Sequence, residues 1–332
     1  MSFICNRISQ VLILSILFFS CNVLEKEKVK AKRNFWFENS VQQNDQLVIL
    51  GKTALSDSLR TWLKQKERIL NHFEPFCEVL ETPNELAYQV VFTQKNLNEN
   101  IYKIAVNKNI IQVNYSNEQL FYTQQFDFLN EFKVVCHELF VNQRKNSLLK
   151  AGYLKKEHQE LIDLHPWTMK IPDDFKIVRH KENFLWIRTE TTSQNSHLMI
   201  SKIPYVSEEQ LGLSKLVDLR DSLAKHNFLY KKYDSTAFMK SEGYFPVTIR
   251  ENSFSGFYSK RLQGAWSIDK TEKKGFALGG VYVGYAIADT TKPKDFYYLE
   301  AFFSAPNTDK LPFIRTLEGI LRTFQLNNTS YE

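Results

Sequence analysis

Hydrophobic residues recur at the three-to-four-residue spacing of a helix in four stretches of the chain. The first stretch, over residues 55–73, predicts a helix that Pro75 ends. Residues 126–152 predict a long helix, and residues 213–224 predict a third one. The clearest pattern predicts a C-terminal helix with Pro312 in its first turn, where the missing N–H costs nothing. Its apolar positions are Phe313, Ile314, Leu317, Ile320, Leu321 and Phe324.

Alternation of apolar and polar residues predicts strands between these helices. In the first half the predicted strands cover residues 46–51, 87–94, 101–106, 109–115 and 119–124. In the second half we expect a hairpin over 175–190, a strand at 197–205, and strand after strand from 245 to 304. Pro166 and Pro172 stop regular structure between the two halves.

The order of these elements predicts an α+β fold made of two mixed α/β units. The first unit should cover residues 35–166. The second should cover residues 167–328 as an antiparallel sheet with a long C-terminal helix packed on it. A chain of 332 residues, 43% of them hydrophobic, is long enough to build two such cores.

An uncharged apolar run near the N-terminus, Val11 to Phe19, is shorter than the about 20 residues that span a membrane. It fits the apolar part of a secretion signal instead. Phe18 to Cys21 resembles the lipobox of bacterial lipoproteins, in which lipid is joined to the cysteine sulfur and the chain is cut before that cysteine. The resemblance implies a signal peptide at residues 1–20 and lipidation, with fatty acids such as palmitate, at Cys21. The alternative is an ordinary secretion signal with a chance cysteine.

Residues 21–34 carry many charges and no packing pattern, which predicts a flexible tether. Its basic side chains would be attracted to anionic lipid headgroups. The expected location is therefore the cell envelope, in the periplasm. The lipid anchor is expected in the outer membrane in preference to the inner one.

The net charge of +6 is spread along the chain, so that neither half is strongly basic. Nucleic-acid binding needs a clustered basic face, and no nucleic-acid partner is expected. The expected partners are the membrane, through the lipid, and an envelope protein bound through the C-terminal domain. Aromatic residues crowd positions 244–303, where they either fill a core or form part of a partner surface.

No catalytic motif is found in the sequence. The stretch CHELF at 136–140 is similar to the zinc motif HExxH, but Val141 stands where the second histidine ligand is needed. His137 and Glu138 are therefore predicted on the polar face of their helix. The glycines of residues 275–289 should sit in a strand where a backbone or a bulky ring comes close. We expect no catalytic residue, no metal site and no cofactor.

Two further residue pairs leave alternatives open. Cys77 and Cys136 could form a disulfide in an oxidising periplasm, or remain as small buried thiols. His158 and His165 lie seven residues apart and could share a helix face, but Pro166 argues against a common site.

Five short segments carry a family resemblance. They are NFLWIR at 183–188, GAW at 264–266, GG at 279–280, EAFFSAP at 300–306 and LEGI at 317–320. With the signal and its cysteine, they resemble an uncharacterised lipoprotein family of Bacteroidota, a domain of unknown function. Members more often have Arg at the position of Gln263 and Gly at that of Ala301. The second half also resembles the PsbP/Mog1-type sandwich, at the level of the fold alone.

The sequence favours a lipid-anchored envelope protein with a non-catalytic binding or accessory role. One alternative is a binder of a small ligand or glycan at the junction of the two domains. The other alternative is an unrecognised hydrolase, which would need an acid, a base and a nucleophile brought together by the fold.

Replacement of Cys21 tests the lipid anchor. Cys21→Ala should abolish labelling by a fatty-acid probe in cells, because the variant lacks the sulfur that accepts the lipid. The chain should then accumulate as the uncut precursor or appear in the soluble fraction. Unchanged labelling and unchanged membrane fractionation of the variant would contradict the prediction.

Overall fold

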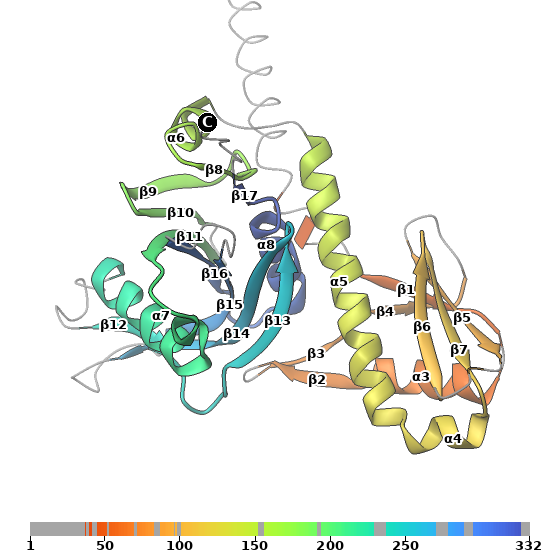
Figure 1. Ribbon diagram of the computed structural model, residues 1–332. Helices are drawn as coiled ribbons and strands as arrows, with labels where there is room; N and C mark the ends of the chain where they lie inside the picture. Colours follow the sequence, from red (N-terminus) through yellow and green to blue (C-terminus); the bar gives the residue numbers. More distant parts are fainter. Residues whose placement is uncertain are drawn as a thin grey trace, which may run out of the picture.

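The chain forms two main β-sheets with one long helix between them (Figure 1). This computed structural model describes residues 37, 40–41, 45–51, 53–69, 72–82, 87–95, 97, 101–151, 156–190, 194–228, 237–269, 278–288 and 295–326. The signal, the tether and Cys21 lie outside the described residues.

The first half contains a five-stranded mixed sheet in the order β4-β1-β5-β7-β6. Its strands are β1 (Gln46–Ile49), β4 (Glu78–Leu80), β5 (Tyr88–Gln94), β6 (Tyr102–Asn107) and β7 (Ile110–Tyr115). All neighbours in this sheet are parallel except β6, which is antiparallel to β7. The strands expected at 46–51, 87–94, 101–106 and 109–115 are confirmed.

Three helices and a hairpin accompany this sheet. They are α3 (Ala54–Lys64), α4 (Glu118–Thr123), α5 (Gln125–Ala151) and the pair β2 (Lys66–Ile69) and β3 (His72–Pro75). The long helix α5 confirms the pattern of residues 126–152. It runs between the two sheets and packs against the C-terminal helix α8 (Leu311–Leu321) (Figure 1).

The second half is built on an eight-stranded antiparallel sheet in the order β12-β14-β15-β16-β11-β10-β9, with β13 also paired to β14. The strands are β9 (Lys176–Lys181), β10 (Phe184–Glu190), β11 (Asn195–Pro204), β12 (Phe238–Ser241), β13 (Thr248–Phe254), β14 (Phe257–Asp269), β15 (Gly279–Ala288) and β16 (Asp295–Ser304). The remaining elements are α6 (Lys156–Ile162), β8 (Trp167–Thr168), the 3-10 helix η1 (Glu208–Leu211), α7 (Leu213–Asn227) and β17 (Gln325–Leu326), which pairs with β8. The expected α+β fold, its hairpin over 175–190 and its closing helix are confirmed.

Both faces of the large sheet are covered, because successive residues of its central strands face opposite cores. On β15 the residues Val281, Val283, Tyr285 and Ile287 join the core that contains α8, and Tyr282, Ala286 and Ala288 join the core that contains α7. Most described aromatic residues of 244–303 are buried between these layers, although Tyr244 is 91% exposed. The crowding of aromatic residues is therefore explained by the two cores.

The glycines of β15 allow neighbouring groups to approach closely, as the sequence predicts. A Cβ added at Gly280 would collide with the carbonyl oxygen of Phe303 and lie 2.9 Å from the indole nitrogen of Trp266. A Cβ at Gly284 would lie 3.1 Å from the hydroxyl of Tyr298.

Two secondary-structure predictions are wrong. The helix expected over 55–73 ends at Lys64, and the chain continues as the β2–β3 hairpin. Pro75 disfavours helical geometry in the residue before it, which helps to keep this part extended. The strand expected at 119–124 is the helix α4, because the Asn117 side chain accepts hydrogen bonds from the N–H groups of Gln119 and Leu120 and caps a helix there.

Cys77 and Cys136 are both buried thiols, which decides between the two alternatives left by the sequence. Burial raises the pKa of the Cys136 thiol well above its usual value. Within the described ranges, no helix is both long enough and apolar enough to cross a membrane. The division of the chain at residues 166 and 167 stays a prediction.

Replacement of Gly280 tests the close approach at β15. Gly280→Ala should lower the free energy of unfolding by about 1–3 kcal/mol, because the added methyl group forces the Phe303 strand or the Trp266 ring to move. Urea unfolding of both proteins measures the difference. Gly243→Ala is the matched control, since a Cβ there meets nothing within 4 Å, and it should leave the midpoint nearly unchanged.

Candidate functional site

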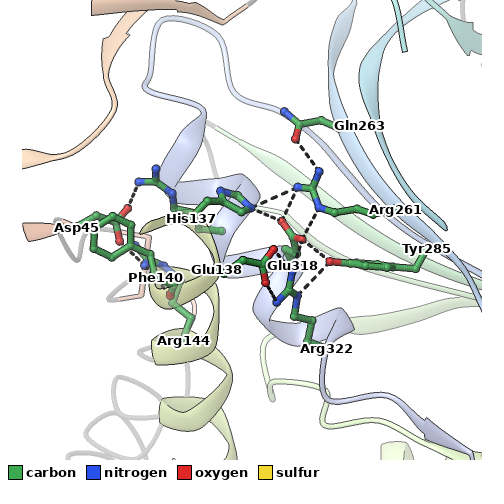
Figure 2. A network of polar contacts seen from close by, with 11 residues as sticks. Asp45, His137, Glu138, Phe140, Arg144, Arg261, Gln263, Tyr285, Glu318 and Arg322 are labelled. Carbon is green, nitrogen blue, oxygen red and sulfur yellow. Dashed lines mark hydrogen bonds and ion pairs between the residues drawn. The ribbon is translucent and has the colours of Figure 1, made fainter. Parts of the chain in front are cut away.

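A buried carboxylate, that of Glu318 on α8, lies where the two halves meet (Figure 2). Its oxygens accept hydrogen bonds from Arg261 Nε at 2.7 Å and Arg261 Nη2 at 2.8 Å. Arg322 Nη2 donates to it at 3.1 Å, and the Tyr285 hydroxyl also donates to it. His137 Nε2, from α5, lies 2.7 Å from the second oxygen. Glu318 therefore joins α5, α8, β14 and β15 at one point.

The protonation states of this cluster follow from burial and charge. Burial alone would raise the pKa of Glu318, but the charge of Arg261 and the hydrogen bonds around the carboxylate hold it well below its usual value. Burial lowers the pKa of His137 and outweighs the attraction of Glu318. Glu318 is thus an anion held mainly by arginine.

Arg322 extends the cluster toward solvent. Its guanidinium donates to both carboxylate oxygens of Glu138 on α5, at 2.9 Å for Nη2, and its Nε donates to the Tyr285 hydroxyl at 3.0 Å. Burial would raise the pKa of Glu138, but the hydrogen bonds and charge of Arg322 lower it overall. Arg322 and Glu138 therefore form a bidentate ion pair that connects α5 to the C-terminal half (Figure 2).

A second charged cluster lies further along α5 and α8. Asp45 accepts hydrogen bonds from Arg144 on α5 and from Arg315 on α8. Arg144 also donates to the Thr316 hydroxyl at 3.0 Å, and Arg315 to the carbonyl of Phe76 at 2.9 Å. These contacts bind the segment before β1 to both helices.

A pocket of about 280 Å³ opens beside the Glu138–Arg322 pair. We call it the junction pocket, because α5 supplies one wall and the second half supplies the other. Its lining residues are Glu138, Asn142, Lys145, Asn252, Ser253, Phe254, Ser255 and Arg322.

The wall from α5 is a polar face of that helix. Glu138, Asn142 and Lys145 are spaced by four and then three residues, which places them on the same side of a helix. The buried residues His137 and Arg144 of the same helix make contacts within the two charged clusters. One helix thereby supplies both the buried clusters and the pocket.

The opposite wall is the turn between β13 and β14. Ser255 and Gly256 have φ angles of 52° and 88°, the left-handed values that a two-residue hairpin turn needs at both positions. The Ser255 hydroxyl donates to the carbonyl of Phe324 at 3.4 Å, which connects the turn to the segment after α8. Strand β13, which leads into the turn, adds Asn252 and Ser253 to the lining of the pocket.

The charged side chains of the junction pocket are two cations, Lys145 and Arg322, and one anion, Glu138. Burial, and then the charge of Arg322, lowers the pKa of Lys145. The lining of the pocket therefore carries one more cation than anions.

The sequence misplaced one of these residues. His137 was expected on the polar face of its helix, but it is buried against the C-terminal half. Glu138 does lie on the polar face of α5, where its ion pair with Arg322 partly buries it. His158 is also buried, and His165 lies beside His180 rather than His158. Among the described residues, no group of three or more histidine, cysteine, aspartate or glutamate side chains is arranged to hold a metal ion.

Sequence reasoning missed Glu318 and Arg322, although α8 carries a signal for them. Arg315, Glu318 and Arg322 are spaced by three and then four residues, so alternating charges follow one face of a helix that is otherwise apolar. A charged stripe on a helix with no exposed side indicates buried ion pairs. The partners Arg261 and His137 are distant in sequence and leave no such local signal.

Three comparisons with known proteins bear on the chain. A family model described as Domain of unknown function (DUF4837) matches residues 154–323, which confirms the expectation of a domain of unknown function. A search of the curated proteins finds no match.

Solved structures resemble the chain over about half its length. The Ran-binding protein Mog1p of Saccharomyces cerevisiae is 12% identical, with 50% of this chain and 92% of Mog1p covered and a TM-score of 0.31. The lipid transfer and protein localization domain of human StarD13 is 10% identical, with 52% of this chain and 98% of that domain covered and a TM-score of 0.19. Mog1 is the fold type that the sequence resemblance names, but TM-scores this low carry no argument about function.

Removal of the Glu318 charge should destabilise the protein. Glu318→Gln keeps the shape of the side chain but leaves Arg261 and Arg322 without their shared anion, which should cost about 3–5 kcal/mol of unfolding free energy. Urea unfolding at pH 7 measures the loss. Glu251→Gln, which removes an exposed carboxylate paired with Lys260, is the control and should change stability little.

Acidic pH should reduce the difference in unfolding free energy between the wild type and Glu318→Gln. The folded-state pKa of Glu318 lies below the value of an unfolded glutamate, about 4.3, so its contribution is present above that pH and is lost as the pH falls toward the folded-state pKa. Below about pH 4, the difference should shrink by about 1.4 kcal/mol per pH unit. An equal difference at acidic and neutral pH would show that the carboxylate charge is not what stabilises the cluster.

Proposed function

The chain belongs to the DUF4837 family, whose description names no activity, and we propose that it is a lipid-anchored cell-envelope protein that binds a small anionic ligand in the junction pocket. The observation that carries this proposal is the lining of the pocket, which combines Lys145 with residues that bear amide and hydroxyl groups. The role is binding rather than catalysis.

The chemistry of the lining favours a small sugar acid or a similar polar anion. The lining residues Asn142, Asn252 and Ser253 are of types that hydrogen-bond to hydroxyl groups, and Lys145 carries an ammonium ion that can pair with a carboxylate. The volume of about 280 Å³ lies at the lower end of ligand pockets, which run from about 300 to 1,000 Å³. The pocket therefore suits one sugar-sized unit.

The groups at the pocket support binding better than the hydrolase alternative. Glu138, the carboxylate in the lining, is held by Arg322, and its lowered pKa makes it a weak base. Ser253 and Ser255 lie in the lining, but the described lining residues include no histidine that could activate a serine hydroxyl.

The lipid anchor rests on the N-terminal sequence. The short apolar run and Ser20 before Cys21 support cleavage and lipidation at that cysteine. The charged tether would then let the pocket sample ligands close to the membrane surface. A protein partner for the C-terminal half has weaker support, because most of the aromatic residues that suggested a contact surface are buried.

Calorimetric titration of the full mature chain in detergent tests the ligand. We expect glucuronate to bind and its neutral counterpart glucose to bind much more weakly, because only glucuronate carries a charge for Lys145. Inorganic phosphate is the third probe and separates a general anion site from one that also needs sugar hydroxyls. Lys145→Gln should weaken glucuronate binding about 10-fold to 100-fold, the value of one charge-assisted hydrogen bond.

Lys150→Gln is the matched control, since Lys150 lies on the same helix but does not line the pocket. It should bind glucuronate like the wild type. The absence of saturable heat with all three probes would overturn the proposed ligand class, as would equal binding by the wild type and Lys145→Gln.

A further inference from the structure

Two histidines that are distant from the junction pocket face each other near the end of the large sheet. His165 lies in the segment between α6 and β8, and His180 lies on β9. Their Nε2 atoms are 3.1 Å apart, and the two ring planes are nearly perpendicular. The chain thus brings two imidazole nitrogens to one point on its surface.

The His165 ring is held firmly, whereas His180 is exposed. His165 stacks on Trp167 with ring centroids 4.7 Å apart and planes 14° from parallel. Trp167 is buried, packs against Phe324, and pairs through β8 with Leu326 of β17. One imidazole is therefore fixed in place, and the other can adjust by a small rotation of its side chain.

The separation of the two nitrogens fits shared coordination of one metal ion. Imidazole nitrogens bind Zn²⁺ at about 2.0–2.1 Å, so two of them at tetrahedral angles lie about 3.3 Å apart. At the right angles of a tetragonal Cu²⁺ site they lie about 2.9 Å apart. The observed 3.1 Å falls between these values.

We propose that His165 and His180 form a binding site for a divalent late transition metal ion, Cu²⁺ or Zn²⁺, through their Nε2 atoms. The ion would replace the proton that now lies between the two rings, and water would complete its coordination. Cu²⁺ should bind more tightly than Zn²⁺, following the general affinity order of first-row metals.

The surroundings suit a cation at this position. A pocket of about 200 Å³ adjoins His165 and leaves room for water on the ion. Glu182 lines the same pocket and brings a negative charge, while the lining cation Lys202 is paired with Asp295 at 2.9 Å.

Four other histidines whose side chains the structure describes do not offer such a pair. His137, His158 and His197 are buried, and His197 accepts a hydrogen bond from the Trp186 indole at 3.2 Å. His226 is exposed on α7, with its Nδ1 2.7 Å from the carbonyl of Ser222. His226 therefore serves as a matched control for an exposed histidine outside the site.

Metal titration of the full mature chain, free of any histidine tag and treated with a chelator, tests the proposal. Cu²⁺ should bind with one strong site and quench tryptophan fluorescence, because Trp167 stacks on a ligand. A large excess of Zn²⁺ should displace Cu²⁺ from the site and reverse the quenching. Electron paramagnetic resonance of the Cu²⁺ form should show nitrogen ligands.

Variants decide whether the pair is the site. Loss of an outer-shell partner lowers metal affinity about 10-fold to 100-fold, so His165→Ala and His180→Ala should each weaken Cu²⁺ binding by at least that much. His226→Ala should bind like the wild type. His180 is exposed, so His180→Ala should fold normally, which unfolding curves would verify.

Two results would overturn the proposal. Equal Cu²⁺ affinity in the wild type and His180→Ala would mean that the two rings share only a hydrogen bond. Equal weakening in His180→Ala and His226→Ala would mean that surface histidines bind the ion without a defined site. Neither result bears on glucuronate binding at the junction pocket, because the two sites share no lining residue.

Discussion

The buried carboxylate of Glu318 is the interaction on which the arrangement of the two halves depends. An ionised carboxylate in an apolar interior is costly unless opposite charges and hydrogen-bond donors surround it. Arg261 from β14, Tyr285 from β15, Arg322 after α8 and His137 from α5 meet that requirement together. Because these four donors come from different elements, the carboxylate fixes α5 and α8 against the sheet.

The junction pocket is a consequence of this constraint. Arg322 is held at one end by Glu318 and Tyr285, and its remaining donors reach Glu138 at the rim of the pocket. The family match begins at residue 154, after α5 ends at Ala151. The pocket therefore combines the family-matched domain with a helix from outside it, so that the N-terminal half supplies part of its lining.

On the other face of the large sheet, a buried ion pair also joins the covering helix to the sheet. Arg220 on α7 and Glu300 on β16 form a fully buried pair, with Arg220 Nη2 3.2 Å from the carboxylate and the Tyr298 hydroxyl donating to it at 2.7 Å. The guanidinium also lies over the Tyr282 ring at 4.4 Å. Each covering helix is thus attached to the sheet by one buried ion pair, which gives a mainly apolar contact a defined position.

Local pattern in the sequence determined the α+β class, the C-terminal helix and the hairpin of β9 and β10, because each follows from the spacing of apolar residues within one segment. It also located the close approach at the glycines of β15. The local pattern could not place the end of α3, because the apolar spacing after Lys64 allows a helix but the chain forms the β2–β3 hairpin there.

Only the tertiary structure showed that His137 and Glu138 face Glu318 and Arg322, and that His165 lies beside His180. Burial of a polar side chain is decided by what the rest of the chain packs against it, and residues far apart in sequence leave no periodicity that reveals the contact.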